Sequence, residues 1–256
     1  MYMLCGLGVL LGSHRLWTHR SFKAHLSVKI VLMILQTMAM QRSVYVWSRD
    51  HRIHHKFSET DADPHNSKRG LFFAHIGWLF LKKHPEMLKK RQEVDVRDLK
   101  ADPVVMFQKQ HMILLSLLVG IIIPVIIPML LWDETLINAF IANIIRYLYA
   151  LHSTFLVNSA AHMYGLRPYD EIIEPRESSF AIYFTFGEGY HNFHHTFPYD
   201  SNSSDYVTKR KAMVKNKLNN EDREDREDSV NYWDNLYGFV YNSSFFWIFY
   251  LYSLMI

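Results

Sequence analysis

The chain has 256 residues and a net charge of only +3, so neither length nor charge indicates nucleic acid as a partner. Its single cysteine, Cys5, excludes an internal disulfide framework and any cysteine-rich zinc site. Hydrophobic residues make up 49% of the sequence and gather in long stretches separated by polar blocks, which favours an integral membrane protein over a soluble one.

The first two apolar stretches are short. Residues 1–12 fall below the roughly 20 apolar residues that a membrane helix needs, and they lack the basic region of a signal peptide. We therefore interpret them as the end of a span whose beginning is absent. Residues 26–40 are also short and contain Lys29, which predicts an amphipathic helix at a membrane surface or, as the less favoured alternative, a buried span.

A polar block and two long apolar stretches follow. Residues 42–100 are polar and charged and are expected to be largely aqueous, whereas residues 111–132 and 135–157 are long enough to span a membrane. Because the turn between these spans is short, they predict a helical hairpin that enters and leaves the bilayer on one side. Arg146 lies inside the second span, and a charge there usually faces other protein groups.

The sequence changes character after Asp200. Residues 201–236 form a polar segment that contains the near-repeat EDREDRED, which is typical of a solvated helix face or a disordered link. Residues 237–256 are apolar and aromatic, but polar side chains near their start make them a mediocre span.

Eight of the 15 histidines fall into three clusters. These clusters are H-R-L-W-T-H with His14 and His19, H-R-I-H-H with His51, His54 and His55, and H-N-F-H-H with His191, His194 and His195. Imidazole is the commonest protein ligand of transition metals, so this density predicts more than one metal ion. In each H-x-x-H-H motif the histidines at i, i+3 and i+4 share one helix face, so three imidazoles can point into one cavity.

Two further features concern the ligand geometry. His14 and His19 are five residues apart, which a straight helix would place about 140° apart around its axis. They converge only if the helix ends or bends between them, or if they bind from either side of a site. His162, in L-V-N-S-A-A-H, is a ninth candidate ligand. Asn158, one helical turn earlier, could hold a metal-bound water through its amide.

Other readings of the histidines carry less weight. The isolated ones are interpreted as ordinary hydrogen-bonded groups: His25, His65, His75, His84, His111 and His152. Zinc is not favoured, because structural zinc sites prefer cysteine, catalytic ones need three protein ligands and a water, and the signature H-E-x-x-H is absent. Soluble di-iron proteins pair two Glu-x-x-His motifs, and Glu188 with His191 supplies only one, which we interpret as coincidence.

The leading hypothesis is therefore a pair of irons held by imidazoles alone. Such a centre would use O2 to take hydrogen from an unactivated C–H bond, which no amino-acid side chain can do. Carboxylates should orient the imidazoles, although the sequence does not assign the partners. The candidates close to the clusters are Asp50, Glu59, Asp61, Asp63 and Glu188.

Five strings carry a resemblance to a known family: GSHRLWTHRSFKAH, WSRDHRIHHKFSETDADPHN, RGLFFAHIGWLFLKKHPE, LVNSAAHMYGLRPYD and GEGYHNFHHTFP. In this order, from about Tyr2 to Asp200, the chain resembles the membrane-bound acyl-CoA desaturases of the stearoyl-CoA or Δ9 type and their insect relatives. The resemblance implies an all-α integral membrane protein in which helical transmembrane hairpins carry a cytosolic, histidine-rich helical cap. It also implies that all nine histidines bind two Fe(2+) ions and that Asn158 acts through a water.

The same resemblance implies substrate-binding residues. Gln41, Trp47 and Thr154 would line a bent tunnel for the acyl chain, and Tyr2 and Gly6 would lie near its closed end, where side-chain size limits chain length. The positions that would contact the CoA head group are Arg49, Asp50, Lys82 and Lys83. Lysine and arginine suit that role because charge-assisted hydrogen bonds hold phosphates well, although a Lys-Lys pair by itself is typical of an ordinary surface.

The chain departs from the family pattern inside its motifs. Arg42 and Val46 stand where the family has Asn and Glu, and Tyr190 and Phe193 stand where it has Trp and Tyr. We expect these changes to alter the fit of the substrate without removing a ligand.

The chain also departs from the family at its ends. The family's first transmembrane helix and basic N-terminal region are missing, so residues 1–200 are expected to be an N-terminally truncated desaturase domain. The likeness stops after Asp200, which indicates a gene-model error such as a retained intron, or a genuine truncation. In the first case residues 237–256 would be translated non-coding sequence and not an evolved span.

These inferences combine into one functional hypothesis. The chain is expected to insert a cis double bond into a long-chain fatty acyl-CoA, at Δ9 by resemblance, using O2 and electrons from cytochrome b5 and its NADH-dependent reductase. It is expected in the endoplasmic reticulum membrane, with its histidines on the cytosolic side of the lipid bilayer. The alternatives are a related di-iron lipid hydroxylase and a catalytically inactive remnant. Regiochemistry, chain length and oligomeric state are not fixed by the sequence.

Overall fold

A computed structural model describes residues 1–199 of the chain. These described residues belong to one compact unit of the chain. Throughout residues 1–199 the regular structure is helical, with two isolated bridges, Leu166 to Glu177 and Glu177 to Tyr190, and no strand. The prediction of a helical chain is confirmed for this part. The predicted segments at 201–236 and 237–256 lie outside the described residues.

The N-terminal helix changes its winding as it proceeds. Helix α1 (Tyr2–Leu7) continues without a break into η1 (Gly8–Thr18), a π-helix with i→i+5 hydrogen bonds. Helix α2 (Leu26–Met38) packs against both. Gly8 permits this close approach, because a Cβ atom there would lie 2.2 Å from the backbone nitrogen of Gln36. The apolar helix α2 is too short to cross a bilayer.

A chain of short helices connects α2 to the apolar hairpin. Helix α3 carries the H-R-I-H-H motif, and its N-cap Ser43 accepts a hydrogen bond from the backbone of Val46. The elements, in order, are α3 (Val44–Lys56), η2 (Ser67–Arg69), α4 (Leu71–His75), η3 (Gly77–Leu79), α5 (Pro85–Lys90), η4 (Arg91–Glu93), α6 (Arg97–Ala101) and α7 (Pro103–Gln110).

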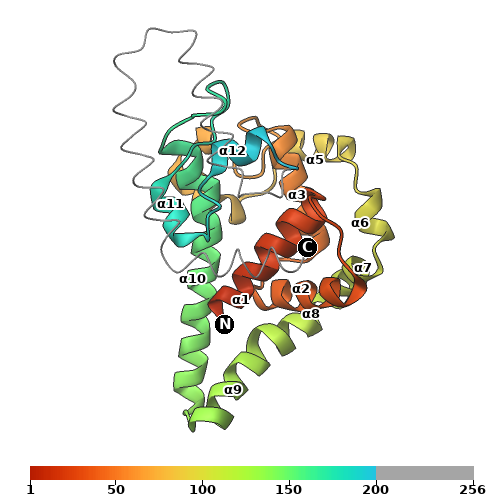
Figure 1. Ribbon diagram of the computed structural model, residues 1–256, viewed down its shortest axis with the longest axis vertical. Coiled ribbons are helices and arrows are strands. Elements are labelled where there is room, and N and C mark those ends of the chain that lie inside the picture. The colour runs from red at the N-terminus through yellow and green to blue at the C-terminus, as the bar shows by residue number, and fades with distance from the viewer. Residues whose placement is uncertain (200–256) are drawn as a thin grey trace. The chain divides into compact units, whose positions relative to one another are not determined.

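Among residues 1–199, two helices are long and apolar enough to cross a membrane. The first comprises α8 (Met112–Leu115), η5 (Ser116–Ile122) and α9 (Ile123–Trp132), and the second is α10 (Leu136–Met163). Figure 1 shows α9 and α10 meeting at a turn at one end of this unit, away from α3 and α12. Large apolar side chains on both helices face outward, among them Ile113, Leu130 and Ile137. These faces suit contact with lipid.

Arg146 joins the second of these helices to two others. Its guanidinium donates hydrogen bonds to the backbone oxygens of Met38 on α2 and Gly120 on η5, at 3.0 and 3.1 Å, and to the side chain of Asn143 at 2.9 Å. The charge therefore faces protein groups, which compensates for its position within an apolar helix.

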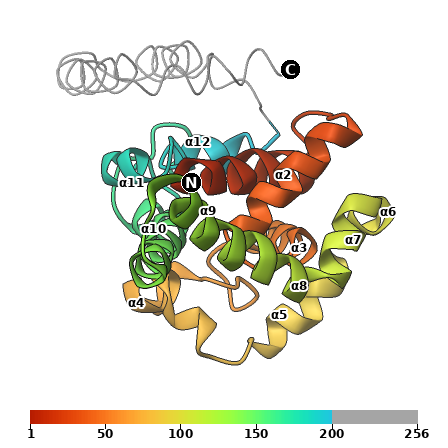
Figure 2. The ribbon, with the colours of Figure 1, turned by 90° about the horizontal axis from the view of Figure 1, so that it is seen from below.

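The chain ends its described part with two short helices, α11 (Ser179–Phe184) and α12 (His191–Thr196), the second of which carries the H-N-F-H-H motif. Figure 2 shows α11 and α12 on one side of this unit and α4 and α5 on the opposite side, with α3 and α10 between them. Helices that are far apart in sequence therefore lie on either side of α3 and α10.

A buried glutamine on α7, Gln108, forms hydrogen bonds with both α2 and α3. The Gln108 side chain accepts a hydrogen bond from the backbone nitrogen of Val44 at 2.8 Å and donates to Gln36 at 2.5 Å and to Thr37 at 2.8 Å. It is fully buried, so no water can replace these partners. The histidine-bearing helix α3 therefore begins at a position that α2 and α7 both determine.

We predict that Gln108→Leu lowers the free energy of unfolding by about 2–4 kcal/mol, because the Val44 nitrogen and the Gln36 oxygen would be left buried without partners. The measurement is denaturant unfolding of the purified protein in detergent. Gln110→Leu is the matched control, since Gln110 lies exposed on the same helix. Equal stability of the two variants would contradict the prediction.

Candidate metal centre and the adjoining cavities

The structure brings all nine candidate histidines together in two groups. Within each group the ligand atoms lie within 4.8 Å of one another. The first group consists of His14, His19, His51, His55 and His194, and the second of His54, His162, His191 and His195. Helix α3 and helix α12 contribute to both groups, whereas η1 with its cap serves only the first and α10 only the second.

The π-helix resolves the spacing problem of His14 and His19. The backbone nitrogen of His19 donates to the oxygen of His14 at 3.0 Å, which is an i→i+5 bond. Such a bond brings residue i+5 to the same side of the helix as residue i, and the two rings lie 4.8 Å apart between centroids. The helix therefore does not need to end between them, because its winding changes.

Each H-x-x-H-H motif is divided between the two groups, which corrects the expectation that its three imidazoles share one cavity. On α3, His51 and His55 belong to the first group and His54 to the second. On α12 the assignment is reversed: His194 belongs to the first group, and His191 and His195 belong to the second. Helical geometry explains the division. Residue i+4 lies about 40° from residue i in one direction around the axis, whereas residue i+3 lies about 60° from it in the opposite direction.

The spacing of the ring nitrogens suits metal ions. The Nε2 atoms of His14 and His194 are 2.9 Å apart, and those of His191 and His162 are also 2.9 Å apart. An imidazole nitrogen binds a transition metal at roughly 2.0–2.1 Å, so two nitrogens at right angles around one ion lie about 3 Å apart. In addition, the buried Nε2 atoms of His19 and His54 find no hydrogen-bond partner within the described part of the chain. A donor set of convergent, partly unsatisfied imidazoles fits a transition-metal centre.

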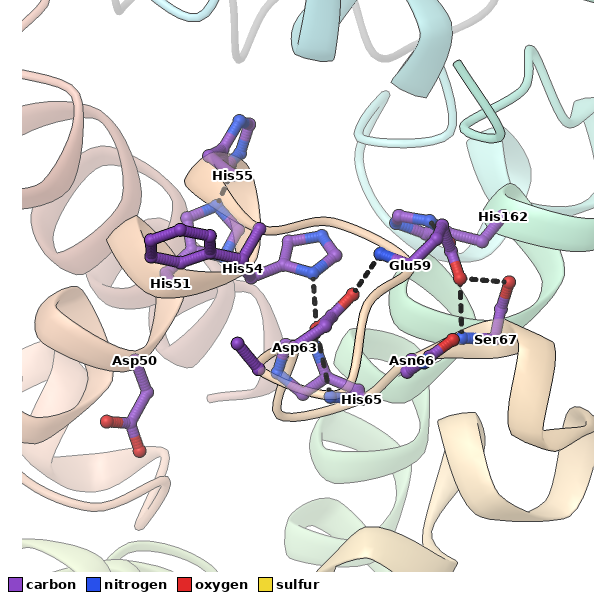
Figure 3. Close-up of polar contacts among 12 residues, drawn as sticks. Asp50, His51, His54, His55, Glu59, Asp63, His65, Asn66, Ser67 and His162 are labelled. Atoms are coloured by element: carbon purple, nitrogen blue, oxygen red, sulfur yellow. Dashed lines mark hydrogen bonds and ion pairs between the residues drawn. The ribbon is translucent and has the colours of Figure 1, made fainter. Parts of the chain in front are cut away.

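Three carboxylates hold three of these rings from behind. The Nδ1 atoms of His14, His54 and His162 lie 3.0, 2.9 and 2.7 Å from oxygens of Glu188, Asp63 and Glu59 respectively. A ring that donates its Nδ1 proton to a carboxylate presents Nε2 to the metal. Figure 3 shows Asp63 beside His54, and Glu59 between His162 and Ser67.

The other two candidate carboxylates do not take part. Asp50 binds Arg49 and Lys83, each at 2.6 Å, and in Figure 3 it makes no contact with the histidines drawn. Asp61 is exposed on the loop after α3. Glu188, read from its spacing to His191 as a coincidence, does not pair with that histidine but supports His14, which the sequence spacing could not reveal.

Burial and mutual repulsion keep most of the imidazoles neutral. Burial first, and then neighbouring rings, lower the pKa of six histidines well below the ordinary value: His19, His51, His55, His191, His194 and His195. Neutral imidazole is the form that binds metal. His54 differs, because the charge of Asp63 outweighs burial and raises its pKa, so a metal there must displace a proton.

The supporting carboxylates stay ionised in this environment. Burial acts to raise the pKa of Glu188, but His14 and Arg15 outweigh it and lower the pKa to about 2. Burial is likewise outweighed at Asp63, where His54 and a backbone hydrogen bond lower the pKa far below the usual range. The negative charges behind the rings are therefore present at neutral pH.

A mostly apolar cavity of about 600 Å³ leads away from the histidines. At one end it is lined by His14, His51 and His191, and at the other by Tyr2 and Gly6. The cavity also contacts the three predicted tunnel residues and the predicted water-binding residue: Gln41, Trp47, Thr154 and Asn158.

A second cavity of about 850 Å³ continues toward the charged side chains around Asp50. Gln41, Trp47 and Thr154 line this cavity as well, and Gln41 donates a hydrogen bond to Thr154 at 2.9 Å where the two meet. A third cavity, of about 340 Å³, is lined by Lys82 and Lys83. Each predicted substrate residue thus lines one of these three cavities, except Arg49, whose buried side chain is directed to Asp50.

Three cavity residues carried no signal in the sequence. Phe186 and Cys5 line the first cavity, and Trp78 lines both the second and the third. Aromatic residues are frequent in this chain, and neither spacing nor charge distinguishes these positions. Only the packing of segments distant in sequence identifies them.

Comparison with known proteins gives a consistent result. The family model described as fatty acid desaturase matches residues 1–204. The chain is 53% identical over 206 residues to a stearoyl-CoA desaturase of Capra hircus, which covers 80% of this chain and 57% of that protein. It is 50% identical to stearoyl-CoA desaturase 5 of Bos taurus, with 80% and 62% covered, and 50% identical to an acyl-CoA Delta-9 desaturase of Acheta domesticus, with 78% and 56% covered. The chain therefore spans somewhat more than half the length of these relatives.

We predict that Asp63→Asn lowers the affinity for bound metal about 10- to 100-fold, because His54 loses the carboxylate that orients it. The measurement is the metal content of the purified protein as a chelator is titrated. Asp61→Asn, a change of the same kind on the same loop but at an exposed position, should leave the metal content unchanged. An equal loss of metal affinity in both variants would contradict the assignment of Asp63 as the residue that orients His54.

Proposed function

The chain belongs to the fatty acid desaturase family, and from this premise we propose that it is an acyl-CoA desaturase with two iron ions. Its substrate is a long-chain fatty acyl-CoA, into which it inserts a cis double bond. The observation that carries the proposal is the opening of one apolar cavity directly onto both histidine groups. An alkyl chain is the ligand that such a cavity suits.

The nine histidines would hold the two irons, one in each group. When bound, iron supplies the oxidising power that no side chain has, with O2 as the oxidant. Two hydrogens leave the acyl chain, and O2 combines with them, two electrons and two protons to give two waters. The described residues contribute orientation: Glu188, Asp63 and Glu59 fix three rings. We assign Asn158, which lines both larger cavities beside the histidines, to holding a water on the metal.

The length of the first cavity supports reaction near the middle of the chain. His14 and Gly6 are eight residues apart on one continuous helix, which corresponds to roughly 10 to 12 Å, because an α-helix rises about 1.5 Å per residue and the wider π-helix η1 rises less. A zigzag chain with carbon–carbon bonds of about 1.5 Å advances about 1.25 Å per carbon, so about eight to ten carbons fit beyond the histidines. A stearoyl chain placed this way meets the histidines at Δ9.

The contact between Gln41 and Thr154 lies where the two cavities meet, and Trp47 stacks on the ring of His51 there, with centroids 4.8 Å apart. We propose that these three residues impose the bend that selects the reacting carbons and a cis product. The remaining carbons and the CoA would lie toward Asp50 and the Lys82–Lys83 side chains.

The reaction needs an electron donor and a membrane. We propose cytochrome b5 with its NADH-dependent reductase as the donor, and the endoplasmic reticulum membrane as the location. The two apolar helices turn at the end of the unit opposite to the histidines, so the histidines would sit on the cytosolic side of a bilayer crossed by this hairpin. Soluble CoA and the electron donor would both reach the centre from that side.

We predict that His55→Ala abolishes desaturation in yeast that lacks its own Δ9 desaturase. The loss should exceed roughly 100-fold, because even removing a group behind a metal ligand costs about 10–100-fold. The measurement is fatty-acid analysis with location of the double bond. His25→Ala is the control, since His25 is exposed and makes no side-chain capping bond. A hydroxylated product from the unchanged chain would favour a hydroxylase, and no product of either kind would favour an inactive remnant.

We also predict that Lys82→Ala raises KM for stearoyl-CoA roughly three- to tenfold and leaves kcat unchanged, since a phosphate contact would be lost far from the reacting carbons. Steady-state kinetics in microsomes measure both constants. Lys89→Ala removes an equally exposed lysine that pairs with Glu86 and should change neither. An unchanged KM for Lys82→Ala would remove this residue from the CoA site.

A further inference from the structure

The far end of the first cavity is built by two segments that are remote in sequence. Helix α1 supplies Tyr2 and Gly6, and the loop between α11 and α12 supplies Phe186. The Phe186 ring packs against the ring of Tyr2 with 5.1 Å between centroids. A residue from the α11–α12 loop therefore helps to close a cavity that otherwise follows the N-terminal helix.

Gly6 and Phe186 fit together as a small residue and a large one. A Cβ atom built on Gly6 would lie 2.7 Å from Cε2 of Phe186 and 3.1 Å from its Cδ2. The ring thus occupies the volume that a side chain at position 6 would need. Because interiors are closely packed, such a pair is sensitive to a change in either partner.

Tyr2 fixes the loop that carries the ring. Its hydroxyl lies 2.9 Å from the backbone oxygen of Phe184 and donates a hydrogen bond to it, and it is also 3.1 Å from the hydroxyl of Ser153 on α10. The loop is therefore tied to α1 and α10 two residues before Phe186. The ring is presented to the cavity by a segment with limited freedom to move.

The backbone at this point is strained in a way that packing must offset. Phe186 has φ of +54°, a left-handed conformation that costs a bulky residue roughly 1–2 kcal/mol. Gly187 follows with φ of +95°, which its lack of a side chain permits. A strained aromatic residue that lines a cavity indicates a position determined by what it contacts.

We infer that Phe186 is a determinant of acyl-chain length, because its ring fills the space left by Gly6 and forms the stop against which the methyl end of the chain rests. The inference rests on the proposed function, since it names the part of the chain that selects among fatty acyl-CoAs. The side chain at position 6 does not set the maximum chain length by itself, because the Phe186 ring fills the space that Gly6 leaves empty.

The test compares full-length Phe186→Val, Gly6→Ala and the double variant with the unchanged chain. Binding of stearoyl-CoA and eicosanoyl-CoA to protein purified in detergent is measured by thermal stabilisation, which does not require turnover. Phe186→Val should raise the affinity for eicosanoyl-CoA relative to stearoyl-CoA roughly 10-fold, because two more methylene groups become buried. Phe180→Val is the matched control, because Phe180 is an exposed residue of α11, and it should leave the ratio of the two affinities unchanged.

Gly6→Ala should shift the preference toward palmitoyl-CoA, since the new methyl group and the ring compete for one space. In the double variant valine leaves room for that methyl group, so its effect should be much smaller than with Phe186 present. Valine is β-branched and is disfavoured at the φ of +54° found here, so Phe186→Leu, which is not β-branched and keeps more of the apolar volume, is measured beside it and decides the test if the valine variant does not fold. An unchanged binding ratio in a folded Phe186 variant, or strict additivity of the two changes, overturns the inference.

Desaturation products from yeast are analysed for the same variants. A shifted binding ratio without any unsaturated product would reject the proposed reaction and retain Phe186 as the chain-length stop. An unsaturated product together with an unshifted binding ratio would support the proposed reaction and reject Phe186 as the chain-length stop. The two proposals therefore fail separately.

Discussion

The convergence of nine imidazoles on two points is the constraint on which the rest of the structure depends. Buried rings with nitrogens about 3 Å apart tolerate one another when most are neutral and when a shared proton or a cation lies between their lone pairs. The fold meets the first condition by burial and repulsion, which lower the pKa of His51 and His55 far below the ordinary value. It prepares the second with carboxylates such as Glu188, which lies behind His14 and turns its Nε2 inward.

One helix sets the distance between the histidines and the end of the cavity. His14 and Gly6 belong to the continuous element formed by α1 and η1, so no hinge separates them. The same element brings His19 beside His14 through an i→i+5 bond. Ligand placement and cavity length are therefore consequences of one backbone path, and the position of reaction along an acyl chain follows from that path and not from a flexible loop.

The sequence predicted those features that depend on local pattern. Hydropathy located the two apolar helices near Met112–Trp132 and Leu136–Met163, and histidine spacing singled out the nine residues that the fold gathers into two groups. It did not predict the division of each H-x-x-H-H motif, because whether i+3 joins i and i+4 depends on where the neighbouring helices stand. Nor did it assign carboxylates: Glu59 reaches His162 across 103 positions in the chain.

The loop between α11 and α12 shows why the remainder required a structure. Phe186 and Glu188 are two residues apart, yet one closes the far end of the cavity and the other supports His14. A Cβ on Gly189 would lie 2.2 Å from the backbone nitrogen of Ile182, so the loop must return tightly against α11 before it enters α12. This tight return places alternate side chains at the cavity end and at the metal ligands. A substitution at position 186 that changed the backbone path would therefore also disturb His14, whereas one that changes only side-chain volume would leave the ligand in place. Chain-length preference can thus vary through the size of this one side chain without loss of the histidine centre.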